Sequence, residues 1–249
     1  MTADETRTGG PAETFPLTRW SVVLAAGDPR TPAGAEALEQ LARAYWKPVY
    51  AYLRRRGLPV EDAKDLTQDF FEALLRRNLP GRADRAEGRF RTFLLASLVN
   101  FLRDARDREA AEKRGGGRRR EAIDLEAVAP EDLEIPGPEA ETPEEAYHRQ
   151  WALGLMRAAL EDLRRRYAAE GKDLRARLFE RYVDLVSGGG GVDYAALAGE
   201  FGCSVTDVTN YLHRARRLYR ELLRARVRDS VARPEEVEEE IRDLRKFLG

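Results

Sequence analysis

Polar and basic side chains that can contact nucleic acid are concentrated in residues 193–218. A short apolar stripe ends there at Gly202, and Ser204 with Asp207 has the Ser-x-x-Asp spacing of a helix N-terminal capping box. A second apolar stripe follows at helical spacing, so we predict two helices joined by a tight turn. The outward positions of the second helix carry side chains that can bond to base edges or phosphates: Thr206, Thr209, Asn210, His213, Arg214, Arg216 and Arg217.

A helix pair of this kind has two interpretations. In a helix-turn-helix unit the second helix enters the major groove, with base contacts near its start and phosphate contacts near its end. Helix pairs joined by a glycine turn also occur as plain packing units. The pattern in residues 193–218 therefore leaves both DNA binding and simple packing open.

Three carboxylates share one face of another predicted helix, at residues 61–77. Asp62, Asp65 and Asp69 follow one another at steps of three and four residues, beside Gln68. Like charges at this spacing repel one another, which favours a basic partner. A solvated acidic surface, on which Lys64 relieves part of the repulsion, is the alternative.

Aromatic and basic residues are mixed in residues 90–104, and a basic stretch follows up to the glycines at 115–117. Aromatic rings can stack on unpaired bases while guanidinium groups follow the phosphate backbone, so this segment is typical of a contact with single-stranded DNA. We expect Phe93 and Phe101, however, to lie in the core.

The composition excludes several classes of site. One cysteine, Cys203, and two histidines, His148 and His213, cannot form a disulfide framework or a Cys/His zinc site. The glycines at 188–191 are not followed by the Gly-Lys-Ser/Thr of a phosphate-binding loop. We therefore expect no catalytic site, no metal and no cofactor. The start of the chain is unlike a secretion signal and no apolar run reaches about 18 residues, which predicts a cytoplasmic protein without membrane contact.

The elements that position these residues are predicted to be helices throughout, an all-α fold, because apolar residues recur at three- and four-residue steps and no strand-like alternation is found. Charge divides the chain. Residues 35–120 carry 20 basic and 13 acidic side chains, residues 121–145 carry ten acidic and no basic ones, and residues 146–228 carry 16 basic and 10 acidic ones. We predict two small helical domains joined by an acidic flexible linker that contains several prolines. The basic excess suits polyanion binding, and solvated helix faces are the alternative.

The predicted boundaries follow from these changes in charge and periodicity. The tail has Val237, Ile241, Leu244 and Leu248 at helical spacing and is predicted to pack on the second domain or to serve as a dock for a regulator. The five segments are an N-terminal extension at 1–34, a helical domain at 35–117, the linker at 118–145, a helix-turn-helix domain at 146–228 and a C-terminal amphipathic helix at 229–249.

The order of these motifs resembles bacterial RNA polymerase sigma factors of the extracytoplasmic-function class. Two segments are similar to sigma region 2, namely EDAKDLTQDFF at 61–71 and FRTFLLASLVNFLR at 90–103. Residues 193–218 are similar to sigma region 4. Because the order and spacing of the segments match too, the resemblance extends over about three quarters of the chain. Residues 15–27 and 114–117 are similar to an extended branch of the class.

The resemblance implies a protein that binds core RNA polymerase and directs initiation at promoters. Asp62, Asp65, Gln68 and Asp69 would face the clamp helices of the polymerase large subunit, and the helix that begins at Val205 would enter the major groove of the −35 element. Contacts to the −10 element would come from Asn100 and Arg103 and from the basic residues near them: Arg91, Arg106, Lys113 and Arg114.

Core RNA polymerase and promoter DNA are thus the expected partners, with an anti-sigma factor or a kinase as an open regulatory alternative. One competing hypothesis is a helix-turn-helix regulator that acts without polymerase. A second is a degenerate sigma-like adaptor, because Thr209 and Tyr211 stand where many relatives carry Lys and Arg. Substituting Asp62, Asp65 and Asp69 distinguishes the sigma hypothesis from the regulator, since only a sigma factor would lose polymerase binding.

Overall fold

The computed structural model describes residues 20–28, 31–77, 80–83, 88–112, 135, 137–138, 140–189 and 191–248. Every regular element in these residues is helical, which confirms the all-α prediction. The first half contains α1 (Trp20–Ala26), α2 (Pro32–Arg55), α3 (Val60–Arg76), the short 3-10 helix η1 (Pro80–Arg82) and α4 (Phe90–Glu112). The second half contains α5 (Pro143–Ala169), α6 (Asp173–Ser187), α7 (Tyr194–Phe201), α8 (Val205–Ser230), the 3-10 helix η4 (Pro234–Glu236) and α9 (Val237–Leu248).

Local sequence explains where the long helices start and stop. Gly57, just after α2, has a φ of +87°, a conformation that other residues adopt only at a cost. At the start of α5 the Thr142 hydroxyl accepts a hydrogen bond from the backbone N–H of Glu145, and the Glu145 carboxylate accepts one from the backbone N–H of Thr142. This capping box starts α5 at Pro143, three residues before the start that apolar spacing predicted.

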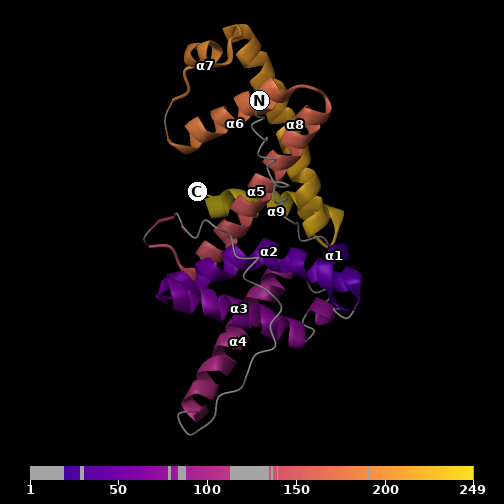
Figure 1. Cartoon of the computed structure of the whole chain (residues 1–249), viewed down its shortest axis with the longest axis vertical. Coiled ribbons are helices and arrows are strands. Elements are labelled where there is room, and N and C mark those ends of the chain that lie inside the picture. The colour runs from indigo at the N-terminus through magenta and orange to yellow at the C-terminus, as the bar shows by residue number, and fades with distance from the viewer. Residues whose placement is uncertain are drawn as a thin grey trace, which may run out of the picture.

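In the residues that the structure describes, buried apolar side chains form two clusters. The first is built by α1 to α4, the first half of α5, the end of α8 and α9, with Trp46 and Phe70 among its fully buried rings. The second is built by the latter half of α5, by α6 and α7, and by the first half of α8. Figure 1 shows α5 and α8 running between the two ends of the molecule. Both helices therefore contribute to both clusters.

The most extensive helix–helix contact in the described residues is between α2 and α5. The Tyr147 hydroxyl of α5 donates a hydrogen bond to the carbonyl of Arg91 at 3.0 Å, and the Tyr147 ring stacks against Tyr45 of α2. Two separate domains with a boundary at residue 146 are not confirmed, because the first half of α5 is part of the core of α1 to α4. With 27 residues α5 is about 40 Å long, enough to span both clusters.

Only the end of the predicted acidic linker lies in the described residues, and there it is docked on helices. Glu141 accepts two hydrogen bonds from the Arg149 guanidinium of α5 and lies 3.4 Å from Arg55 of α2. The Glu141 side chain is only 6% exposed. Residues 118–134, the greater part of the predicted linker, lie outside the described residues.

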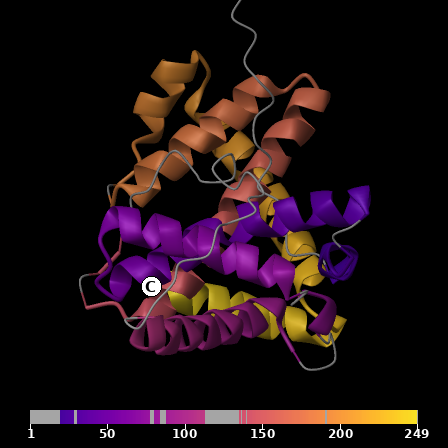
Figure 2. The ribbon, with the colours of Figure 1, turned by 60° about the horizontal axis from the view of Figure 1, so that its bottom comes forward.

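The predicted helix in the tail is confirmed as η4 and α9. Helix α9 contacts α5 and α8, and its Val237 and Leu244 belong to the first cluster. Figure 2, which brings the α1–α4 end forward, shows the yellow α9 ribbon within that end of the molecule. Across the described ranges, none of the helices combines the length and apolarity needed to cross a membrane.

Candidate nucleic-acid interface

Helices α7 and α8 form the predicted helix pair. Gly202 ends α7 in the left-handed conformation, with a φ of +60°. The Ser204 hydroxyl then accepts a hydrogen bond from the backbone N–H of Asp207 at 3.1 Å, and the Asp207 carboxylate accepts hydrogen bonds from the hydroxyl and the backbone N–H of Ser204. These bonds lower the pKa of Asp207. The capping box predicted from Ser204 and Asp207 is thereby confirmed.

Removing this cap is expected to destabilise the helix pair. The substitution Ser204→Ala leaves the backbone N–H of Asp207 without its side-chain acceptor and should lower the free energy of unfolding by about 1 kcal/mol. Urea unfolding followed by circular dichroism measures the change. Thr206→Ala is the matched control, because Thr206 is exposed and does not cap the helix. A loss as large in Thr206→Ala as in Ser204→Ala would contradict the assignment.

Most of the residues predicted to contact DNA lie on the solvent side of α8. Six of the seven are exposed: Thr206, Thr209, Asn210, His213, Arg214 and Arg217. Arg216 is the exception. It is half-buried, donates a hydrogen bond to the Tyr194 hydroxyl at 3.1 Å and lies 4.5 Å from the centre of the Tyr182 ring. Arg216 thus connects α8 with α6 and α7.

The predicted acidic face of α3 is only partly open to solvent. Asp62 and Asp65 are exposed, whereas Gln68 and Asp69 are half-buried. Lys64 forms an ion pair with Glu61 at 2.9 Å. Acidic side chains in the first turn of a helix also interact favourably with its dipole, which gives Asp62 a stabilising role apart from any partner.

Helix α4 presents polar side chains along its middle. Asn100, Arg103 and Arg106 are exposed at steps of three residues. Phe101 is buried and Phe93 packs partly buried against the first cluster, which confirms their prediction as core residues. Two further candidates for the −10 contact, Lys113 and Arg114, lie outside the described residues.

Among the candidates for DNA contact that lie in the described residues, Arg91 alone is buried. Its guanidinium donates to both carboxylate oxygens of Glu240 in α9, at 3.1 and 2.9 Å, and lies 4.5 Å from the centre of the Trp151 ring. The residue is 3% exposed. A phosphate could therefore reach Arg91 only if α9 moved away.

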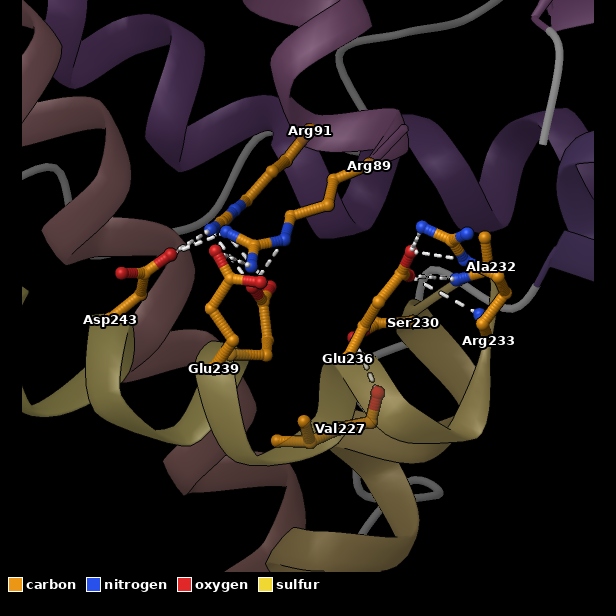
Figure 3. Close-up of polar contacts among 10 residues, drawn as sticks. Arg89, Arg91, Val227, Ser230, Ala232, Arg233, Glu236, Glu239 and Asp243 are labelled. Carbon is orange, nitrogen blue, oxygen red and sulfur yellow. Dashed lines mark hydrogen bonds and ion pairs between the residues drawn. The ribbon is translucent and has the colours of Figure 1, made fainter. Parts of the chain in front are cut away.

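Arg89, which no motif of the sequence singles out, shares the same acidic partners. Its Nε atom lies 2.8 Å from Glu240, and its guanidinium also pairs with Glu239 at 3.4 Å and with Asp243. Figure 3 shows Arg89 and Arg91 pointing from one side toward Glu239 and Asp243. The sequence does show a group of acidic residues in the tail helix. Nothing in it indicates that their partners are arginines about 150 positions earlier in the chain.

Burial and the arginines shift the acidic pKa values of this cluster in opposite directions. For Asp243, burial raises the pKa, but hydrogen bonds and attraction from Arg89 and Arg91 outweigh it, so the pKa is lowered. For Glu240, burial dominates over the attraction of both arginines and the pKa is raised. The two carboxylates thus differ because Glu240 is enclosed more deeply than Asp243, with side chains 1% and 32% exposed.

His148 of α5 stacks on Phe247 of α9, with ring centres 4.7 Å apart. Burial, together with repulsion from Arg91 and Arg89, lowers the pKa of His148 from 6.5 to about 4, and Asp243 only partly opposes this. A histidine with a lowered pKa binds its proton more readily when the chain is unfolded. The stability contributed by neutral His148 is therefore lost as the pH falls from about 6.5 toward about 4.

Acidification is accordingly expected to weaken the fold around α9. Between about pH 7 and about pH 5 the contribution of His148 should lower the free energy of unfolding by about 1–2 kcal/mol, allowing for its partial exposure. Denaturant unfolding at both pH values measures this. The variant His148→Phe should lose less free energy of unfolding between the two pH values than the unsubstituted protein does. The control His213→Asn, at an exposed histidine, should lose as much as the unsubstituted protein. Equal losses in the protein and in His148→Phe would refute the expectation.

The described residues contain no cluster of His, Cys, Asp and Glu that could hold a metal ion. Comparison of the chain with protein-family models, with curated proteins and with solved structures found no match.

Proposed function

We propose that this chain is a sigma factor of the extracytoplasmic-function class that binds core RNA polymerase and directs initiation at promoters. One observation carries the proposal: three helices, in the order of the family motifs, each present exposed side chains of the chemistry that their role requires. These are acidic residues on α3, amide and guanidinium groups on α4, and a capped helix-turn-helix with an exposed polar face on α8. A protein with this role works in the cytoplasm.

The polymerase contact would use the first half of α3. Asp62 and Asp65 have the exposure needed to pair with basic side chains of a clamp helix. Gln68 and Asp69, half-buried, would lie at the rim of such a contact. The interaction is charge-assisted and is therefore expected to weaken as salt increases.

The DNA contacts would be divided between two helices. Asn100, Arg103 and Arg106 on α4 would engage the −10 element, and the start of α8 would read the −35 element in the major groove. Thr209 and Asn210 are the exposed side chains best suited to base edges. Arg214 and Arg217, one turn further along α8, are suited to phosphates.

Binding to core polymerase tests the proposal directly. Purified full-length protein should co-elute with core RNA polymerase at low ionic strength and support transcription from a promoter fragment. The double substitution Asp62→Asn with Asp65→Asn should weaken this binding by about tenfold or more, because two charge-assisted contacts are lost.

The matched control is Glu36→Gln with Glu39→Gln. These exposed acids of α2 have the same three-residue spacing, and their replacement changes the net charge equally. Polymerase binding should persist in the control. If the unsubstituted protein does not co-elute with polymerase, the proposal fails, and DNA binding without polymerase would favour the helix-turn-helix regulator.

A further inference from the structure

The ionic cluster between α4 and α9 joins two segments that are far apart in the sequence. Arg91 and Glu240 are 149 positions apart, yet their side chains are 4% and 1% exposed and bonded in bidentate fashion. Asp243 contacts both Arg89 and Arg91, and Glu239 contacts Arg89 from the exposed side (Figure 3). Two guanidinium groups are thus covered by three carboxylates of a single short helix.

Packing alone does not require these charges. A buried ion pair loses most of its attraction to desolvation, so apolar side chains of similar volume would hold α9 in place as well. The planar fork of arginine binds carboxylate and phosphate in the same bidentate geometry. The Nε–H of Arg91 is buried and has no hydrogen-bond partner in the described residues, so its donor capacity is not exhausted by the carboxylates.

Arg89 and Arg91, at the N-terminal end of α4, therefore form what we call the anion-binding face. The dipole of the 23-residue helix α4 adds a partial positive charge at this end. From Arg91 to Asn100 the helix rises about 14 Å and makes about two and a half turns, so the two side chains point to opposite sides of α4 and a strand that contacts both must pass around the helix. In the described arrangement the carboxylates of α9 occupy the face.

Helix α9 is attached in a way that allows it to leave. It has 12 residues, too few to be stable as an isolated helix, so its order depends on its tertiary contacts. Those contacts are apolar, aromatic and ionic. Val237 and Leu244 lie in the first cluster, other apolar side chains of α9 pack against it, Phe247 stacks on His148, and the Arg224–Glu238 ion pair adds to the ionic cluster itself. A short turn joins α9 to α8, where Glu236 accepts hydrogen bonds from the backbone N–H groups of Ala232 and Arg233 (Figure 3). Local opening of such a terminal element is less costly than global unfolding.

We propose that α9 is a tethered competitor of nucleic acid: its carboxylates occupy the anion-binding face of Arg89 and Arg91, and promoter DNA engages this face when α9 is released. The inference rests on the proposed function only in taking the polyanion to be promoter DNA. It gives the C-terminal helix a regulatory role, because any condition that displaces α9 strengthens DNA binding.

Removing the competing charges in the full-length protein tests this. The variant Glu240→Gln with Asp243→Asn should bind a labelled duplex of about 30 base pairs about tenfold more tightly in fluorescence anisotropy. Its salt dependence should steepen by about 1.8 in the log–log slope, because two further phosphates are contacted. The control Glu235→Gln with Glu238→Gln raises the net charge equally, at exposed positions, and should change neither quantity to this extent. Adding Arg89→Gln and Arg91→Gln to the first variant should cancel its gain.

Hydrogen exchange on the unsubstituted protein gives a readout that does not depend on how the variants fold. Saturating duplex should speed the exchange of amides in residues 237–248, because DNA displaces α9. Unchanged or slower exchange there, or a gain in affinity equal to that of the control, would overturn the inference. If polymerase binding is absent but both signatures are seen, the proposed function fails while the competitor role stands. If the protein binds polymerase and promoter DNA but shows neither the gain in affinity nor the faster exchange, the competitor role fails while the proposed function stands.

Discussion

Replacing Arg91 by Met alone, or Glu240 by Leu alone, is expected to lower the free energy of unfolding by about 3 kcal/mol, whereas replacing both should change it by less than about 1 kcal/mol. Each single change leaves a charge that is almost fully buried without its main partner. The expected cost is at the low end for buried pairs, because Glu240 keeps a contact with Arg89 and Arg91 keeps one with Asp243. In the double variant the remaining charges, Arg89 with Glu239 and Asp243, stay paired.

A double-mutant cycle in urea measures this coupling. Arg224 and Glu238 provide the control, because they form an ion pair between α8 and α9 with both side chains more than half exposed. Their single substitutions, Arg224→Met and Glu238→Leu, should change stability by less than about 1 kcal/mol. Additive losses in the Arg91–Glu240 cycle would mean that the two side chains stabilise the fold independently, contrary to the geometry. A small cost for the double variant would also support the view that the buried pair is retained for something other than stability.

The second large effect is expected on DNA affinity. Replacing Arg214 and Arg217 by Ala should weaken binding of the polymerase complex to promoter DNA by about 30- to 100-fold at low salt and reduce the log–log salt slope by about 1.8. Both side chains are exposed on α8. The ion pair between Arg217 and Glu221 is long, at 3.8 Å, so Glu221 competes only weakly with a phosphate for Arg217. Because the loss concerns phosphates, it should be similar for all promoter sequences.

Two comparisons sharpen this test. The control Arg177→Ala with Arg181→Ala removes the same charge from exposed positions of α6 and should leave most of the salt slope intact. The substitution Arg216→Ala should act differently from those of Arg214 and Arg217. It should lower the thermal stability of the α7–α8 pair, because the contacts of Arg216 with Tyr194 and Tyr182 are lost. Promoter binding unaffected by loss of Arg214 and Arg217 would exclude a DNA role for this face of α8.

The sequence by itself determined the helices and their inner faces. The Ser204–Asp207 capping box is a local signal, acting over four residues or fewer, and it predicted the start of α8 correctly. Apolar spacing placed the start of the first long helix at residue 35, whereas α2 begins at Pro32. The same spacing predicted that Phe101 is buried. It also separated the outward residues of α8 from its core residues, except at Arg216, whose partners lie on two other helices.

The tertiary structure alone decided which helix covers which surface. Periodicity shows that a helix has an apolar face, but not which distant segment packs on it, because that depends on the shapes and charges of both partners at once. The first half of α5 therefore joined the core of α1 to α4, and Arg91, expected at the DNA, was buried by Glu240 of α9. Charge complementarity between segments about 150 residues apart leaves no local pattern in the chain.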